Sequence, residues 1–128
     1  MMIEKVSEMV INPKDLLEIY CGVGTFTLPL SKIFSKVFAT ENNRSAIKCL
    51  KKAMYKNQIH NIMHARLSAE EVCDAFHGKK FFRLNEIDIN NLDISHVLVD
   101  PPRLGLTNEV IDLIKNFKNI IYISCNPE

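Results

Sequence analysis

Short apolar runs alternate along the chain with stretches that have a helical period. Runs at 15–20, 36–40, 61–67, 97–99 and 119–124 have the length and composition of buried strands. Helices are predicted over 25–34, 43–57 and 107–117, and another is predicted to open at Ser68. Strands that alternate with helices favour a parallel sheet with right-handed crossovers. We therefore predict an α/β domain from residue 15 onward, preceded by a lead-in segment over residues 1–14.

Local signals refine this pattern. Asn43 is a plausible cap for the clearest helix, and Ser68 with Glu71 fits a capping box. Pro29 falls early in the 25–34 helix, where a proline is tolerated. Residues 78–94 are basic and then polar, without a clear period, and are predicted to form a loop or irregular insertion.

Composition narrows the class of protein. A chain of 128 residues with 47% hydrophobic content predicts one domain with a real core, and a net charge of +1 leaves RNA binding to a local patch or to another domain. No apolar run approaches the roughly 20 residues of a membrane span, and no signal peptide is evident, which predicts a soluble, cytoplasmic protein. The four cysteines lack C-x-x-C or zinc spacing, which predicts free thiols and no metal site.

Unusual residues follow the predicted strands, and the carboxyl ends of parallel strands form the ligand edge of such a sheet. Gly22 and Gly24, two of only four glycines, follow the first strand at the start of a helix, where a ligand can approach the backbone and meet a positive dipole end. Thr27 stands where a dinucleotide binder would have its third glycine, so a sharp junction without a ligand remains the alternative. Glu41 follows the second strand, where an acidic residue can accept ribose hydroxyls. A solvated glutamate is the other interpretation.

Two further strand ends carry candidate chemistry. Asp100-Pro101-Pro102-Arg103 forms a stiff turn whose aspartate could hold a substrate N–H or a cofactor, or could be an Asx-type turn with a surface arginine. Cys125, followed by Asn-Pro, is predicted to lie on the ligand side, where a thiolate would be a strong nucleophile. A small buried hydrophobe is the usual role of a free cysteine, and is the interpretation for Cys49 and Cys73. Small size explains Cys21, and a solvated helix face is favoured over an RNA contact for Lys48, Lys51, Lys52 and Lys56.

Together these motifs resemble the RNA uracil-5-methyltransferases that use S-adenosylmethionine. The first family motif corresponds to Leu17-Glu18-Ile19-Tyr20-Cys21-Gly22-Val23-Gly24-Thr25-Phe26, the second to Asp100 through Arg103, and the third to Ser124-Cys125-Asn126-Pro127. The resemblance spans residues 15–128. Phe82-Arg83-Leu84 ahead of Ile87-Asp88 looks most like the tRNA branch of the family, which forms ribothymidine in the T-loop.

The resemblance implies a Rossmann-like class I methyltransferase fold, with a mostly parallel sheet, helices on both faces and the C-terminal strands missing. It implies S-adenosyl-L-methionine as cofactor and the T-arm of tRNA as partner. Cys125 would be the nucleophile, adding to C6 of a flipped-out uracil so that C5 can take up the methyl group. The cofactor would be held by Tyr20, Gly22, Gly24, Thr25, Glu41 and Asp100. Thr25 stands where some relatives have Asn, which also keeps a hydrogen-bonding side chain.

Other parts of the family pattern are expected outside these 128 residues: an upstream RNA-binding region, a cofactor-contacting glutamine and a general-base glutamate beyond Glu128. We therefore expect the chain to be part of a catalytic domain that turns over poorly or not at all alone. Three other interpretations stay open. An NAD-dependent oxidoreductase leaves Cys125 without a role, an amino-methyltransferase would have an aromatic residue in place of Arg103, and a non-catalytic cofactor-binding module would have lost turnover.

Overall fold

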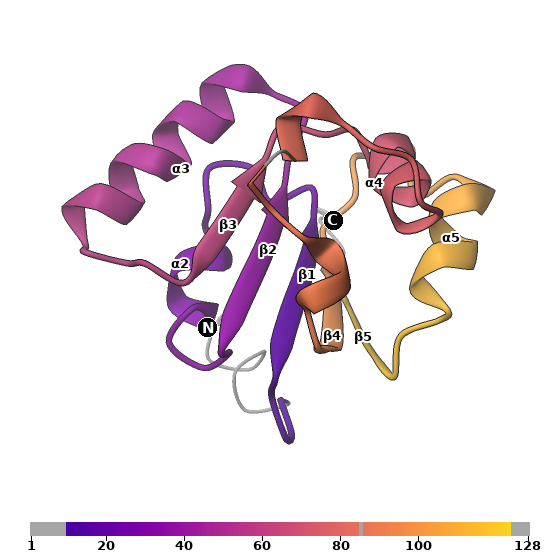
Figure 1. Ribbon diagram of the computed structural model, residues 1–128, viewed down its shortest axis with the longest axis horizontal. Coiled ribbons are helices and arrows are strands. Elements are labelled where there is room, and N and C mark those ends of the chain that lie inside the picture. Colours follow the sequence, from indigo (N-terminus) through magenta and orange to yellow (C-terminus); the bar gives the residue numbers. More distant parts are fainter. Residues whose placement is uncertain (1–9, 85, 124–128) are drawn as a thin grey trace.

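A five-stranded parallel sheet with helices on both faces makes up residues 10–84 and 86–123, which the computed structural model describes (Figure 1). The strands lie in the order β3-β2-β1-β4-β5, and every pairing is parallel, which confirms the predicted fold class. The strands are β1 (Asp15–Ile19), β2 (Lys36–Thr40), β3 (Ile62–Ala65), β4 (Ile94–Val99) and β5 (Asn119–Tyr122). The helices are α2 (Thr27–Leu30), α3 (Arg44–Lys56), α4 (Ala69–Phe76) and α5 (Asn108–Ile114), with the 3₁₀ turns η1 (Phe82–Leu84) and η2 (Ile89–Asn91).

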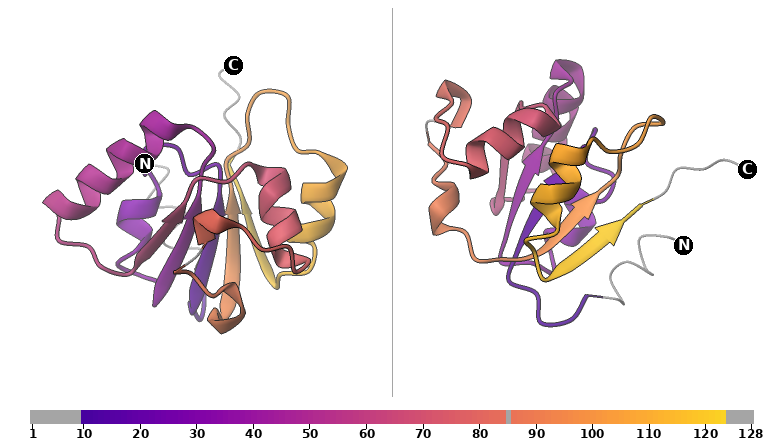
Figure 2. Two further views of the ribbon diagram at one scale, coloured as in Figure 1. Left: turned by 45° about the horizontal axis from the view of Figure 1, so that its top comes forward. Right: turned by 90° about the vertical axis from the view of Figure 1, so that its right-hand side faces the viewer.

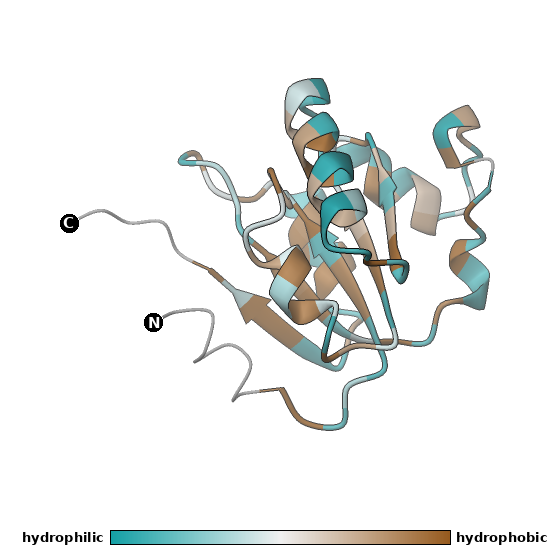
Figure 3. Ribbon diagram, turned by 90° about the vertical axis from the view of Figure 1, so that its left-hand side faces the viewer, coloured by the Kyte–Doolittle hydropathy of each residue, from teal (hydrophilic) through white to brown (hydrophobic). Residues whose placement is uncertain are grey.

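The central strand β1 organises the core, because it pairs with β2 on one side and β4 on the other. All of its residues are buried, including Asp15 and Glu18, so burial does not alternate along the strand, as expected when both faces of a sheet are covered. Leu17 packs in the cluster that includes α4 and α5, and Leu16 packs with Leu30 and Leu50 from α2 and α3. Figure 2 shows α4 and α5 side by side on one face, and Figure 3 shows hydrophobic residues concentrated in the strands. None of the described helices is long and apolar enough to cross a membrane.

Helix α2 is shorter than predicted: it covers Thr27–Leu30 rather than 25–34. Pro29 has no N–H to donate, and after Leu30 the chain continues in turns. The side-chain amide of Asn61 then donates to three carbonyls of this segment, those of Ser31 (2.7 Å), Phe34 (3.2 Å) and Ser35 (3.2 Å). Carbonyls that follow the short helix are therefore satisfied by the residue just before β3.

Strand β4 begins three residues earlier than predicted, at Ile94. The polar residues Ser95 and His96 interrupt the apolar pattern, so the sequence predicted a later start for this strand. His96 is nevertheless buried, because its ring packs edge-on against Phe34 at 5.2 Å between centroids and its Nδ1 lies 2.7 Å from the Ser95 hydroxyl. Burial lowers the pKa of His96, so the ring is neutral at physiological pH. A buried polar side chain with its partners present is compatible with a central strand.

The remaining boundaries differ by a few residues. Asn43 and Ser68 cap α3 and α4 as predicted, the latter with a complete capping box. Strand β3 and helix α5 are shorter than the predicted 61–67 and 107–117, and β5 is described only to Tyr122 rather than to residue 124. Residues 78–84 and 86–93 are irregular apart from the two 3₁₀ turns, as predicted, whereas Ile94 at the end of the predicted loop belongs to β4. At the sheet edge β5 pairs only with β4 among the described strands, and its Ile120 and Tyr122 are about half exposed.

The turn between β1 and α2 packs directly against α3. Gly24 adopts a φ of +101°, and a Cβ added there would lie 2.7 Å from Cδ1 of Leu50. Leu50 is fully buried, so it cannot move aside without disturbing its neighbours. Gly78, just after α4, has nearly the same φ of +102° but nothing within 4 Å of an added Cβ. The two positions therefore share a φ that disfavours side chains but differ in the close contact that an added Cβ would make.

We expect Gly24→Ala to lower the free energy of unfolding by about 1 kcal/mol or more beyond the loss caused by Gly78→Ala, because only the first adds a clash in a packed core. Urea denaturation of the two variants beside the unchanged chain measures this difference. Equal losses would mean that Leu50 moves aside freely and that the turn is not held against α3.

Candidate functional site at the carboxyl edge

The candidate residues lie where the carboxyl ends of β1, β2 and β4 meet. Because β1 is flanked by β2 and β4, the chain leaves it toward α2 on one face and reaches β4 from α4 on the other. This is the topological switch point of an open parallel sheet, where ligands bind in such folds. The order of strands therefore brings residues from distant parts of the sequence to one edge.

The glycine turn exposes backbone at this edge. Tyr20 and Gly22 both have positive φ, +66° and +59°, so the chain turns sharply as it leaves β1. The Cys21 N–H donates to the Thr40 carbonyl at 3.0 Å, which ties the turn to the end of β2. A Cβ at Gly22 would meet nothing within 4 Å, so there is open space beside the backbone. Helix α2 has only four residues and begins at Thr27, so the prediction that a helix dipole favours a ligand at the glycine turn is wrong. The feature of the turn that still favours a ligand is its open backbone.

Glu41 connects this turn to the start of α3. Its Oε1 accepts the Gly22 N–H at 3.0 Å and its Oε2 accepts the Asn43 N–H at 2.9 Å. The carboxylate thus holds two loops at a set separation. Because each carboxylate oxygen has two lone pairs, Glu41 keeps the capacity to accept two further hydrogen bonds from a ligand.

A hollow of about 330 Å³ opens beside Glu41. It brings Tyr20 and Glu41 together with the loops that follow β3 and β4, whereas Gly22, Gly24, Thr25 and Asp100 are not in its lining. The loop residues were missed from sequence. The signal that could have found them is topological, since the loop after each parallel strand reaches the same edge. The lining residues are Tyr20, Glu41, Asn42, Leu67, Ser68, Ala69, Glu70, Pro102, Leu104, Gly105 and Thr107.

The turn after β4 borders the hollow from the other side. Asp100 is half-buried and its N–H donates to the Ile19 carbonyl at 3.4 Å, which sets the aspartate beside the end of β1. Pro101 is buried, and the Pro102 carbonyl accepts the Gly105 N–H at 2.9 Å, which closes a tight turn. Leu104 on this turn is 98% exposed. Thr25, the remaining predicted cofactor residue, is exposed in the glycine turn.

The described cysteines are free thiols, as predicted. Cys21 and Cys73 are buried, but Cys49 is exposed, so its interpretation as a buried residue is wrong. Cys49 lies on α3 two positions from Ile47, which turns it away from the buried face. Burial raises the pKa of Cys21 and also that of Cys73, to about 11, so neither is a thiolate at neutral pH. Cys125, the predicted nucleophile, lies outside the described residues. In the described part of the chain, no group of three or more His, Cys, Asp or Glu could hold a metal ion.

Glu18 is a functional candidate that sequence reasoning missed. It is 1% exposed in the middle of the sheet, beneath the glycine turn, and accepts a 2.6 Å hydrogen bond from the Thr27 hydroxyl. Burial, opposed by the Thr27 hydrogen bond and assisted by the negative charge of Asp100, raises the pKa of Glu18 to about 8. The side chain is therefore mostly protonated at neutral pH. The sequence signal that could have identified Glu18 is an acidic residue within a predicted buried strand.

Solved structures with the same arrangement define the class of protein. The structure of Pyrococcus abyssi tRNA (uracil-54, C5)-methyltransferase in complex with S-adenosyl-L-homocysteine matches 99% of this chain and 28% of its own, with a TM-score of 0.71 and 29% identity. An rRNA methylase from Streptococcus thermophilus matches 94% of this chain and 68% of its own, with a TM-score of 0.67 and 15% identity, which supports the fold alone. The fold is that of the class I S-adenosylmethionine-dependent methyltransferases.

The family is narrower than the fold. The model of the tRNA (uracil-5-)-methyltransferase family matches residues 1–128, and the chain belongs to this family. A tRNA/tmRNA (uracil-C(5))-methyltransferase from Campylobacter hominis is 55% identical over 127 residues, which are 98% of this chain and 35% of the relative. The Nitratiruptor protein of the same description is 50% identical over 115 residues, 89% of this chain and 32% of the relative. The chain thus spans about a third of the length of these curated relatives.

Because folded Glu18 keeps its proton at a pH where the unfolded chain has lost it, the stability of the protein should fall as pH rises from about 4.5 to about 8. Glu18→Gln keeps the acceptor for Thr27 but cannot ionise. We expect the free energy of unfolding of the variant, relative to that of the unchanged chain, to increase as pH rises across this window, by at most about 1.4 kcal/mol per pH unit. Urea denaturation of both proteins at several pH values measures the difference. A difference independent of pH would contradict a protonated Glu18.

Proposed function

We propose that the hollow beside Glu41 binds S-adenosylmethionine. The observation that carries this proposal is the convergence of Tyr20 and Glu41 on one hollow at the switch point, with the Glu41 carboxylate bonded to the N–H of Gly22 in the adjoining glycine turn. Its volume of about 330 Å³ lies within the range of small-ligand sites. The unused lone pairs of Glu41 would accept the ribose hydroxyls, as the sequence predicts. The bound S-adenosyl-L-homocysteine in the related Pyrococcus abyssi enzyme supports the same class of ligand.

The proposed reaction is methylation of C5 of a uridine in the T-arm of tRNA. Bound S-adenosylmethionine supplies an electrophilic methyl group. The Cys125 thiolate forms a bond to C6 of the uracil, which places the displaced electron pair at C5 and makes that carbon nucleophilic. When C5 takes up the methyl group, the methyl–sulfur bond would break and its electron pair would stay on the sulfur of S-adenosylhomocysteine. A general base then removes the C5 proton, and the electrons of that C–H bond restore the double bond as the Cys125–C6 bond breaks. The uridine must leave its stack to reach the thiolate.

The resemblance predicts which groups of the catalytic site this chain contributes. The general-base glutamate and the cofactor-contacting glutamine are expected outside these 128 residues, so we expect the chain alone to bind cofactor but to turn over poorly or not at all. Multiple-turnover methylation of T-arm RNA by this chain would contradict that expectation. With tRNA as the proposed substrate, we also propose that the protein acts in the cytoplasm.

Calorimetric titration with S-adenosylhomocysteine tests the cofactor site. We expect binding to the unchanged chain, no binding of NADH, and a loss of about tenfold or more in Glu41→Gln, because a carboxylate accepts hydroxyl hydrogen bonds more strongly than an amide. Glu70→Gln is the matched control, since Glu70 lines the same hollow, whereas the N–H groups of Gly22 and Asn43 donate to Glu41. Binding of NADH, or equal losses in both variants, would contradict the assignment of Glu41 to the ribose.

A T-arm RNA containing 5-fluorouridine tests the nucleophile, because fluorine at C5 blocks the final elimination and leaves the enzyme attached. We expect a covalent adduct in the presence of S-adenosylmethionine, lost completely in Cys125→Ala. Cys49→Ala, which removes an exposed free thiol, should form the adduct as before. Denaturing gel electrophoresis detects the adduct by its reduced mobility. An adduct that persists in Cys125→Ala would exclude Cys125 as the attacking group.

A further inference from the structure

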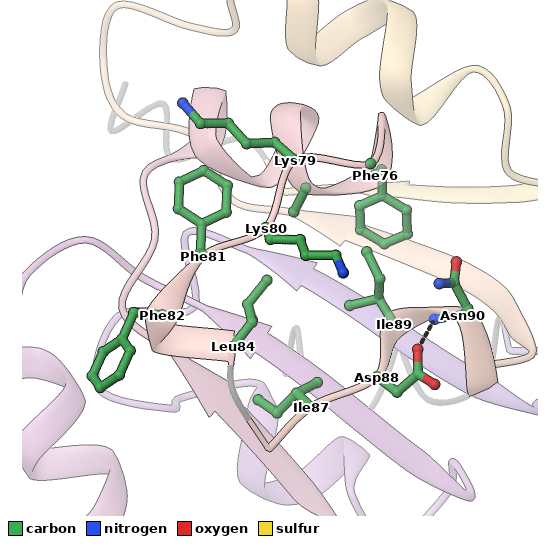
Figure 4. Close-up of a pocket in the computed structure, with 12 residues that line it drawn as sticks. Phe76, Lys79, Lys80, Phe81, Phe82, Leu84, Ile87, Asp88, Ile89 and Asn90 are labelled. Atoms are coloured by element: carbon green, nitrogen blue, oxygen red, sulfur yellow. Dashed lines mark hydrogen bonds between the residues drawn. The ribbon is translucent and has the colours of Figure 1, made fainter.

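The irregular segment between α4 and β4 lies outside the cofactor hollow and has no role in the proposed chemistry. It borders a second and larger hollow, of about 610 Å³, between the end of α4 and the two 3₁₀ turns. Figure 4 shows Phe76, Leu84 and Ile89 in the apolar part of this hollow, with the chain of Lys80 extending across it. Such a combination of apolar wall and cationic side chain is typical of ligand sites.

The segment is firmly attached to the rest of the domain. Arg83 on η1 donates to the Arg66 carbonyl at 2.6 Å and to both carboxylate oxygens of Glu71, at 3.2 and 2.7 Å. The pairing holds the pKa of Glu71 down at about 2, so the pair is charged at physiological pH. Leu84 and Ile87 also pack against the main core. A surface held in this way is preorganised for a partner, since little ordering remains for binding to impose.

Phe82, next to Arg83, is the exception to this packing. Its side chain is 92% exposed, and in Figure 4 it points away from the hollow that the other labelled side chains surround. It also lines a neighbouring hollow that includes Met63 and His64 of β3. The adjacent Phe81 differs, because Lys79 Nζ lies 5.3 Å and Arg83 Cζ 5.5 Å from its ring centroid. Phe82 therefore offers a largely uncovered ring at the lip between two hollows.

Two lysines line the larger hollow beside this ring, whereas Glu86 lines the neighbouring hollow together with Phe82. Lys79 and Lys80 are exposed, and no ion pair joins either of them to a carboxylate within the described part of the chain. Asp88 is the acidic residue in the lining, and its Oδ1 accepts the Asn90 N–H at 3.0 Å. An exposed aromatic ring near lysines that form no ion pair among the described residues matches the requirements of single-stranded nucleic acid, whose bases stack and whose phosphates are anionic.

We propose that Lys79, Lys80 and Phe82 form a second RNA contact, separate from the cofactor hollow. The Phe82 ring stacks on an unpaired base, and the two lysines contact the flanking phosphates. The inference rests on the proposed function, which makes RNA the substrate. It assigns a task to the Phe82-Arg83-Leu84 motif, in which Arg83 anchors the segment and Phe82 meets the RNA.

Fluorescence anisotropy with a labelled T-arm stem-loop RNA tests this contact on the 128-residue chain. We expect Phe82→Ala to raise the dissociation constant about 5- to 150-fold, the range typical of one stacked base. The double variant Lys79→Ala/Lys80→Ala should make the slope of log affinity against log salt shallower by about 1.4, corresponding to two single-strand phosphates.

The controls come from α3, which presents the same chemistry elsewhere on the surface. Tyr55 is 89% exposed, and Lys51 and Lys52 are exposed beside it. Tyr55→Ala and Lys51→Ala/Lys52→Ala should leave RNA affinity and its salt slope unchanged. Equal losses in these controls, no effect of the Phe82 and lysine variants, or no RNA binding by the unchanged chain would each overturn the proposal.

Titration of the same variants with S-adenosylhomocysteine separates this inference from the proposed function. Phe82→Ala should bind it like the unchanged chain, because Phe82 does not line the cofactor hollow. Loss of RNA binding with cofactor binding intact supports the second contact. Failure of the unchanged chain to bind S-adenosylhomocysteine, with RNA binding still dependent on Phe82, would reject the cofactor assignment and leave the RNA contact standing.

Discussion

Two backbone N–H groups that converge on one carboxylate hold the ligand edge of this domain together. The Glu41 oxygens accept from Gly22 and from Asn43, so one side chain sets the spacing between the glycine turn and the first turn of α3. Charge-assisted hydrogen bonds of this kind are stronger than neutral ones. The hollow beside Glu41 keeps its shape because the loops that border it are connected through this residue, and the same carboxylate is the group proposed to meet the ribose.

The architecture could be read from the sequence because its causes are local. Apolar runs separated by helical periods gave the parallel sheet, and the caps at Asn43 and Ser68 were correct. The errors have non-local causes. Helix α2 is short, and the carbonyls that follow it accept hydrogen bonds from Asn61, 30 positions after Ser31. Strand β4 begins early because the Phe34 ring, from across the fold, covers His96.

The candidate site was predictable in part, because the sequence places its residues at the ends of predicted parallel strands. Tyr20 and Glu41 do meet at one hollow, as strand ends in a parallel sheet must, but the share of that hollow contributed by Leu67 and Leu104 depends on how two loops fold over the edge. The neutral state of Glu18 depends on complete burial, which no local pattern reveals. Cys125 lies outside the described residues, and its role stays a prediction. Rigid strands thus position the chemistry, while irregular segments determine what reaches it.

The outer edge of β5 has a practical consequence for anyone who handles this chain in solution. Among the described strands β5 pairs on one side only, and Ile120 and Tyr122 stand half exposed along it. A row of unpaired backbone donors and acceptors flanked by apolar side chains is a template for edge-to-edge association. Protein concentration therefore becomes a variable in its own right, and aggregation state should be monitored by light scattering before any affinity is interpreted as that of a monomer.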